Sequence, residues 1–94
     1  MTYRLTFNEH ALSEWHSLPE TVRARLKKKL AERLENPHVP KSRLRGGQNR
    51  YKIKLMRPAI RLVYEVHDNI VTVHVLAIGA RAGSRVYKLA DRRT

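Results

Sequence analysis

The order of hydrophobic and polar residues in the first third of the chain predicts one strand followed by two helices. Hydrophobic and polar side chains alternate through residues 2–7, which is the period of a half-buried strand. Asn8 can cap a first helix, whose hydrophobic side chains gather along one side: Ala11, Leu12, Trp15 and Leu18. A second helix starts near Pro19, with an apolar stripe of Val22, Leu26, Leu30 and Leu34 and, outside that stripe, Lys27, Lys28, Lys29 and Arg33. It ends before Pro37, because the residue preceding a proline is disfavoured in helical backbone.

Three more strands and a short helix are predicted for the rest of the chain. Residues 37–50 form a loop that contains the Gly46-Gly47 pair. Alternating apolar positions then mark two strands on either side of a turn at Pro58: Tyr51, Ile53 and Leu55, followed by Ile60, Leu62, Tyr64 and Val66. After a tight turn at Asp68-Asn69, residues 70–78 are almost wholly apolar, as expected of a central strand covered on both faces. Residues 84–90 can form a short terminal helix.

These elements predict a single small domain over residues 1–94, of the α+β class, in the order β-α-α-β-β-β(-α). The two N-terminal helices are expected to pack on a mostly antiparallel four-stranded sheet. The chain has no cysteine, which excludes disulfides and thiolate metal sites. Its first ten residues lack an apolar targeting segment, and no stretch is apolar for long enough to span a membrane. We therefore expect a soluble, cytoplasmic protein with no membrane partner.

The net charge indicates a polyanionic partner. Twenty Lys and Arg against eight Asp and Glu give a formal charge of +12 and an isoelectric point near 11.0. The charge is also segregated, since residues 41–61 contain eight basic residues and no acidic one: Lys41, Arg43, Arg45, Arg50, Lys52, Lys54, Arg57 and Arg61. Nucleic acid is the commonest ligand of such a surface, and a merely solubilising surface is the alternative.

Metal-dependent and triad chemistries find no support in the sequence. Only Glu65 and Asp68 lie among the predicted strands, and they form no carboxylate cluster. The histidines share no metal-ligand spacing: His10, His16, His38, His67 and His74. No Ser/His/Asp or Cys/His arrangement and no phosphate-binding GxxxxGK[ST] loop is present. An enzyme built on this chain would work with Lys, Arg and Tyr, without a cofactor or metal.

Lys52 and Lys54 are the strongest candidates for such chemistry. Two residues apart on a strand, their side chains leave the same face roughly 7 Å apart, and Arg61 on the next strand can join them. At an effective dielectric of about 20, two unit charges at that distance repel by roughly 2.4 kcal/mol. Such repulsion favours the neutral form of a lysine, which can then act as a general base beside a bound phosphate. Lysines on an exposed strand also prevent edge-to-edge aggregation, so a purely structural role stays open.

Other cations and one tyrosine are weaker candidates. Arg45 can hold a phosphate from the glycine loop or lie in solvent, and Arg81 follows the end of the last predicted strand. Tyr87 can stack on a base, as aromatic residues do in nucleic-acid grooves, or cap the core. The predicted RNA-binding residues around the candidate catalytic group are Arg43, Arg45, Arg50 and Lys88.

Seven segments of the chain resemble the RelE toxins of bacterial toxin–antitoxin pairs, which are ribosome-dependent mRNA endonucleases. The segments span essentially the whole length: "ALSEW", "RLKKKL", "KSRLRG", "YKIKL", "RLVYEV", "IGAR" and "VY". The resemblance implies a fold similar to microbial ribonucleases and cleavage without metal. One departure follows Arg81, where Ala82 and Gly83 replace residues that are often charged in the family.

The resemblance also implies a role for each candidate residue. The 2′-hydroxyl of the mRNA attacks the adjacent phosphodiester, with Lys54 as the base, and leaves a 2′,3′-cyclic phosphate. Lys52 and Arg61 stabilise the charge of the transition state, and Arg81 lies at the leaving 5′-oxygen. Tyr87 holds a base splayed out for in-line attack, and Arg45 helps to hold the RNA.

The partners that the resemblance implies are mRNA in the ribosomal A site, with its ribosomal RNA, and a small acidic antitoxin similar to RelB. The antitoxin would wrap the basic surface or displace the terminal helix, and the toxin–antitoxin complex would bind operator DNA through the antitoxin. Two other functions remain as hypotheses. One is a non-catalytic module that binds RNA, the ribosome or DNA, and the other is a gyrase-inhibiting toxin of the same fold.

Overall fold

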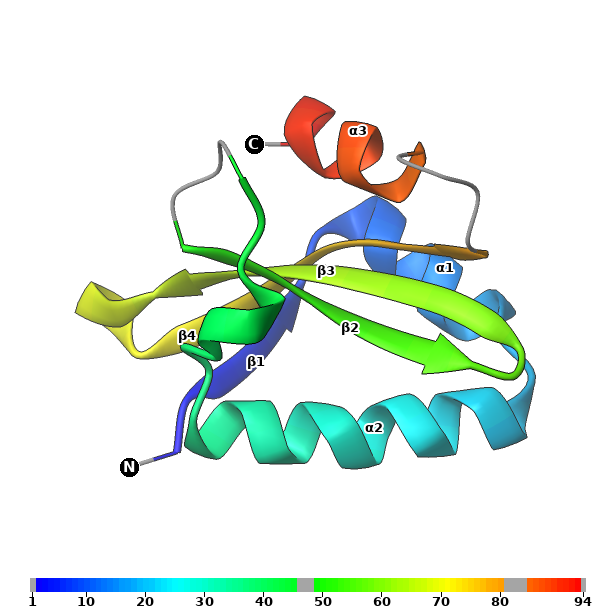
Figure 1. The fold of residues 1–94 in the computed structure, drawn as a ribbon, viewed down its shortest axis with the longest axis horizontal. Coiled ribbons are helices and arrows are strands. Elements are labelled where there is room, and N and C mark those ends of the chain that lie inside the picture. Colours follow the sequence, from blue (N-terminus) through cyan, green and yellow to red (C-terminus); the bar gives the residue numbers. More distant parts are fainter. Residues whose placement is uncertain (1, 46–48, 81–84, 94) are drawn as a thin grey trace.

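The computed structural model of the chain describes residues 2–45, 49–80 and 85–93. Its main elements follow the predicted order: a strand and two helices come first, then three strands and a terminal helix (Figure 1). They are β1 (Arg4–Phe7), α1 (Glu9–Ser17), α2 (Glu20–Glu35), β2 (Arg50–Met56), β3 (Ala59–His67), β4 (Thr72–Ala80) and α3 (Arg85–Arg92). Two short 3-10 turns, Pro40–Ser42 and Asp68–Ile70, lie in the connections.

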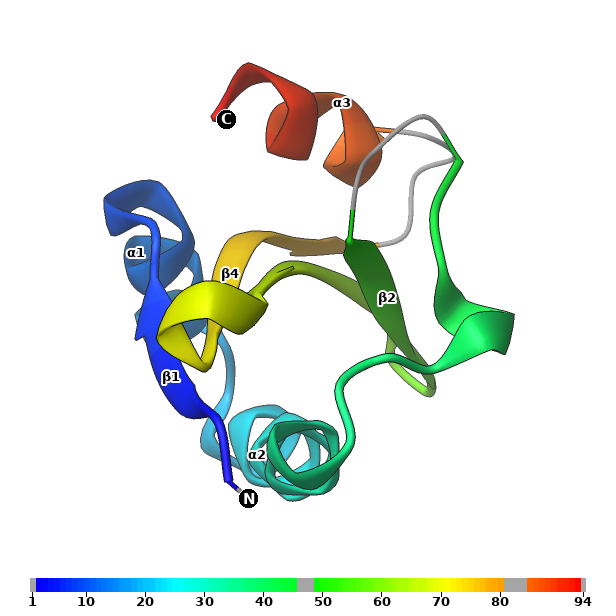
Figure 2. The ribbon, with the colours of Figure 1, turned by 90° about the vertical axis from the view of Figure 1, so that its left-hand side faces the viewer.

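The strands form one four-stranded sheet in the order β1-β4-β3-β2. The pairs β2–β3 and β3–β4 are antiparallel, while β1 runs parallel to β4. Figure 2 shows the sheet between α2 on one side and α3 on the other. The predicted α+β class, the element order and the mostly antiparallel sheet are therefore confirmed, and β3 and β4 are its central strands.

The main core lies between the sheet and the first two helices. It contains the predicted stripe of α2, with Val22, Leu26 and Leu30 buried and Leu34 partly buried, and the alternate apolar residues of β2, β3 and β4. Asn8 caps α1 as expected, since its side-chain oxygen accepts a hydrogen bond from the His10 N–H. Leu12 is 41% exposed, however, and Trp15 instead packs its ring on Phe7 at 5.5 Å between centroids.

A smaller core lies on the other face of the sheet, beneath α3. Val63 of β3 and two residues of β4 pack there against Val86 and Ala90 of α3. Gly79 of β4 makes this approach possible, because a Cβ atom at that position would come within 3.0 Å of the Val86 Cγ2 atom. The apolar character of β4 thus reflects burial on both faces, as predicted.

The connection between β3 and β4 differs from the predicted two-residue turn at Asp68-Asn69. It is a 3-10 turn followed by Val71 in the left-handed conformation, with a φ of 50°. The side chain of Asp68 accepts hydrogen bonds from the Tyr3 hydroxyl at 2.6 Å and contacts the His38 ring at 2.9 Å. These contacts lower the pKa of Asp68, the Tyr3 hydrogen bond most of all. The prediction missed them because both partners lie far away in the sequence.

No helix in the described ranges is both long and apolar enough to cross a membrane.

Candidate active site

Lys52 and Lys54 of β2 and Arg61 of β3 lie on the sheet face opposite α1 and α2. The residues that alternate with them point into the main core, so the pleat directs the three cations the other way. Lys54 is directly across from Arg61 in the antiparallel register, and Lys52 is across from Val63. Opposed residues have Cβ atoms about 4.5–5.5 Å apart, and Lys52 is two positions along the strand, roughly 7 Å from Lys54. The fold therefore brings the predicted group of three cations together.

Within residues 2–45, 49–80 and 85–93, neither lysine forms an ion pair with a carboxylate. The Lys54 side chain is exposed and that of Lys52 is half-buried. Because their charges are not balanced from within this part of the chain, a phosphate bound between them would relieve their mutual repulsion.

Tyr87 reaches this cation group from α3. Its ring is partly buried against the smaller core, and the guanidinium carbon of Arg61 lies 5.6 Å from the ring centroid, in cation–π range. The two interpretations of Tyr87 are therefore compatible, since the residue packs on the core and also borders the cationic face.

Beside Tyr87 is a cavity of about 190 Å³. Its walls contain two predicted RNA-binding residues, Arg45 and Arg50, together with Leu44, Ala90, Asp91 and Tyr87 itself. Arg50 is only 14% exposed and pairs with Glu65 at 3.3 Å and with Asp91 of α3. Its guanidinium is therefore held by two carboxylates of the chain itself, a largely buried one of Glu65 and an exposed one of Asp91. Arg45, by contrast, is exposed.

The remaining predicted residues either do not line this cavity or lie outside the described ranges. Arg43 is exposed and makes an isolated antiparallel bridge with Tyr51, which continues the sheet past β2. Lys88 is exposed on α3. Arg81, Ala82, Gly83 and the Gly46-Gly47 pair lie outside the described residues.

Arg33 supports strand β2 through hydrogen bonds that the sequence pattern did not predict. Its guanidinium donates hydrogen bonds to the Lys52 carbonyl at 3.1 Å, the Tyr64 hydroxyl at 2.9 Å and the Ser42 hydroxyl at 3.2 Å. The Tyr64 hydroxyl in turn donates to the Pro37 carbonyl at 2.7 Å. Burial raises the pKa of Tyr64, and the hydrogen bond from Arg33 opposes that change. The sequence pattern assigns Arg33 to the polar side of α2. The one signal that could have indicated its partly buried contacts is that Arg33 is next to Leu34 of the apolar stripe.

The histidines do not form a metal site in the described part of the chain, where no group of three or more His, Cys, Asp or Glu residues could hold an ion. His67 and His74 each contact one neighbouring polar side chain. The His67 ring lies 2.8 Å from a Glu65 carboxylate oxygen, and the His74 Nδ1 atom lies 2.7 Å from the Thr6 hydroxyl. Each of these residues lies on the sheet face away from the main core.

The stability of the fold is expected to decrease as the pH falls below the ordinary histidine pKa of 6.5, partly because of His74. Burial, and then the charge of His67, lower the pKa of His74, while Glu65 opposes them. Below pH 6.5 the unfolded chain therefore binds more protons than the folded one, so the free energy of unfolding falls with the pH. Urea unfolding across a pH series should give a shallower dependence for His74→Asn than for wild type. The exposed His10→Asn variant is the matched control, and a slope in His74→Asn equal to wild type would contradict the assignment.

Comparison with known proteins places this geometry in a toxin family. Residues 5–84 match the family model described as the ParE toxin of the type II toxin–antitoxin system parDE. The chain is also 50% identical to the mRNA interferase toxin RelE of Escherichia coli, over 99% of this chain and 98% of that protein. A second relative, an mRNA interferase RelE of Shigella flexneri, has the same identity and coverage.

Solved structures agree with the sequence relatives. The fold is similar to that of a mutant of E. coli toxin RelE in the free state, with a TM-score of 0.92 and 48% identity, covering 99% of this chain and 98% of that one. It is also similar to a chain of the intact E. coli RelBE toxin–antitoxin complex, with a TM-score of 0.83 and 49% identity, covering 85% and 98%.

Proposed function

Because the chain belongs to the RelE family of toxins of type II toxin–antitoxin systems, we propose that it cleaves mRNA in the ribosomal A site as a metal-independent endoribonuclease and so inhibits translation. The observation that carries this proposal is the cation group of Lys52, Lys54 and Arg61 on one sheet face, bordered by Tyr87. The 50% identity to RelE proteins named as mRNA interferases extends over 99% of the chain, so the relationship includes this face.

The proposed reaction is attack of an RNA 2′-hydroxyl on the adjacent phosphodiester. Lys54 accepts the 2′-hydroxyl proton, the new bond forms between the 2′-oxygen and phosphorus, and the bond from phosphorus to the 5′-oxygen breaks. The leaving 5′-oxygen takes a proton from water, and the products are a 2′,3′-cyclic phosphate and a 5′-hydroxyl. Lys54 fits the base because its amine is exposed and lies directly opposite Arg61, which can hold the scissile phosphate next to it.

The other cations stabilise charge in this mechanism. Lys52 and Arg61 flank Lys54 on the same face, so both can contact the non-bridging oxygens, where negative charge increases in the transition state. We assign Arg81 to the leaving 5′-oxygen, since it follows the end of β4 in sequence. An arginine gives up its proton too reluctantly to be an efficient acid, so charge stabilisation is the role we assign to it.

Tyr87 and the loop cations would hold the RNA. Arg61 lies over the Tyr87 ring, so a base could stack on this ring next to the cation that binds the scissile phosphate. Arg45 on the wall of the neighbouring cavity, with exposed Arg43 and Lys88, would bind flanking phosphates. Arg50 is expected to contribute indirectly, by holding Asp91 of α3 through its ion pair.

The proposed partners are the translating ribosome and an acidic antitoxin. E. coli RelE is found in a RelBE toxin–antitoxin complex, and a RelB-like antitoxin is the corresponding partner of this chain. Its acidic residues would neutralise the net charge of +12, and the complex would bind operator DNA through the antitoxin. Cleavage of ribosome-bound message places the activity in the cytoplasm.

The test is cleavage of a defined mRNA by the purified chain, with and without ribosomes. We expect site-specific cleavage only in the presence of ribosomes, with 2′,3′-cyclic phosphate ends on the upstream fragments. A non-catalytic module would instead give salt-sensitive association without new RNA ends. The matching family model is a ParE model, so DNA supercoiling by gyrase is measured in parallel. Inhibition of gyrase without RNA cleavage would overturn the proposed function.

A further inference from the structure

The second half of β4 has an open edge that β1 does not cover. The parallel pairing of β1 with β4 ends where Phe7 pairs with Val75, and the Asn8 N–H then donates to the Val75 carbonyl. Strand β4 nevertheless continues to Ala80. Its register with β3 also shifts, because Val63 pairs with Ala77 while the next residue of β3 pairs with Val75. This shift makes Leu76 the extra residue of a bulge, whose backbone groups need partners outside the ladder.

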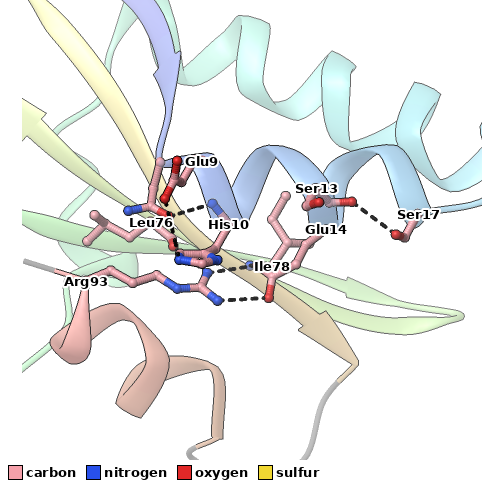
Figure 3. A network of polar contacts seen from close by, with 9 residues as sticks. Glu9, His10, Ser13, Glu14, Ser17, Leu76, Ile78 and Arg93 are labelled. Atoms are coloured by element: carbon pink, nitrogen blue, oxygen red, sulfur yellow. Dashed lines mark hydrogen bonds and ion pairs between the residues drawn. The ribbon is translucent and has the colours of Figure 1, made fainter.

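Arg93, the residue after α3, supplies a partner for the Leu76 carbonyl, and Glu14 of α1 supplies one for the nearby Ile78 N–H on the same edge. Arg93 donates from its Nη1 atom to the Leu76 carbonyl at 2.8 Å, and the Ile78 N–H donates to the Glu14 Oε1 atom at 3.0 Å. The two side chains also bind each other through two contacts, Nη1 to Oε1 at 2.9 Å and Nη2 to Oε2 at 3.2 Å. Figure 3 shows both side chains meeting over β4 from opposite sides, α1 and the end of α3. The bidentate Glu14–Arg93 pair therefore joins α1, β4 and the end of α3.

This Glu14–Arg93 pair is well shielded from solvent. The side chain of Arg93 is 13% exposed and that of Glu14 is 27% exposed, in contrast to 88% for Glu9 on the preceding turn of α1. A charged hydrogen bond is stronger in such a setting than on the surface, and it restricts both side chains to one geometry.

The apolar contacts of α3 alone are few. The helix has eight residues, too few to be stable by itself, and within its residues 86–92 the buried side chains are those of Val86 and Ala90. At its N-terminal end Val86 is seated against Gly79, and at its C-terminal end Arg93 is tied to Glu14 and Leu76. Tyr87 lies between these two attachments, so its position over Arg61 depends on both of them.

We propose that Glu14 and Arg93 are positioning residues for RNA cleavage, which hold α3 on the edge of β4 so that Tyr87 stays over Arg61. This inference rests on the proposed endoribonuclease function. Neither residue belongs to the cation group of Lys52, Lys54 and Arg61, and the Arg93 guanidinium binds Glu14 and the Leu76 carbonyl, so the pair acts through Tyr87 and not on the RNA itself.

The test compares Arg93→Met with Arg92→Met, its exposed neighbour, which loses the same charge. We expect Arg93→Met to reduce ribosome-dependent cleavage about 10–100-fold, as for a misplaced active-site group, and Arg92→Met to cleave at close to the wild-type rate. Glu14→Gln is also expected to reduce the cleavage rate, whereas Glu9→Gln, the exposed control on the same helix, should cleave at close to the wild-type rate. Wild-type cleavage by Arg93→Met would overturn the proposal.

A double-mutant cycle with Tyr87→Ala separates positioning from general stability. If Arg93 acts through Tyr87, Arg93→Met should cost little further activity in the Tyr87→Ala background. A loss of equal size in both backgrounds would mean that the pair acts elsewhere, which contradicts the proposal. The urea unfolding midpoint of each variant is measured as well, and the rates are compared under conditions in which every variant is folded.

Hydrogen exchange gives a readout that does not depend on cleavage. The amides of α3 and of Ile78 are expected to exchange faster in Arg93→Met, while those of β3 keep their protection. If wild type itself failed to cleave RNA, the proposed function would be wrong, whereas these exchange rates would still test whether the pair holds α3. Unchanged protection of α3 in Arg93→Met would overturn the positioning role.

Discussion

Lys54→Ala is expected to lower the rate of ribosome-dependent mRNA cleavage by about 10²–10⁴-fold, the usual contribution of a general base. The substitution removes the amine that we assign to the 2′-hydroxyl proton. It should leave most of the RNA affinity, because Lys52 and Arg61 remain on the same face. Lys54 is exposed and contributes no side chain to either core, so the fold should be retained.

Single-turnover cleavage at saturating ribosome concentration measures this effect apart from binding. Lys28→Ala is the matched control, since it removes the same charge from the exposed surface of α2, on the other side of the sheet. Raising the pH of the assay should also restore part of the activity of Lys54→Ala, because hydroxide then accepts the 2′-hydroxyl proton in place of the amine. Cleavage by Lys54→Ala at the wild-type rate would show that another group accepts the proton.

Arg61→Leu is expected to reduce the same rate by about 10²–10³-fold, the size reported for removing one donor to a developing negative charge. The guanidinium lies opposite Lys54 and over the Tyr87 ring, so its loss affects charge stabilisation and the stacking surface together. Leucine keeps an apolar side chain at the margin of the smaller core, which limits the structural cost.

Arg61→Lys separates these contributions. Lysine keeps the positive charge but lacks the planar fork that binds two phosphate oxygens at once. We expect Arg61→Lys to cleave at a rate between those of wild type and Arg61→Leu. Adding Tyr87→Ala should reduce that rate by a smaller factor than it does in wild type. A rate in Arg61→Leu within a few-fold of wild type would remove Arg61 from the catalytic group.

The pattern of the chain was enough to predict the layers of the fold and the face of the candidate site. Alternation in β2 and β3 assigns Tyr51 and Ile53 to the core and Lys52 and Lys54 to the opposite face, because a strand has a period of two. The apolar stripe of α2 likewise predicts its buried side. These are local properties, since each follows from a few consecutive residues.

Contacts between distant residues could not be predicted in this way. Glu14 and Arg93 are 79 positions apart, and nothing in either neighbourhood distinguishes them from other surface charges. The same holds for Arg33, whose hydrogen bond to the Lys52 carbonyl joins α2 to the edge of β2. The prediction that Arg50 binds RNA rests on its place in a basic segment, and only the fold reveals that its guanidinium pairs with Glu65 and Asp91.

Local residue order is therefore sufficient for the strands, the helices, the strong positive charge and the chemical type of the site. The strand register that sets Lys54 against Arg61, the bulge at Leu76 and the seating of α3 exist only in the folded chain. The reason is physical: a periodic pattern specifies which face of an element is buried, but many registers and many partners satisfy the same pattern. Only simultaneous packing of all the elements selects one of them.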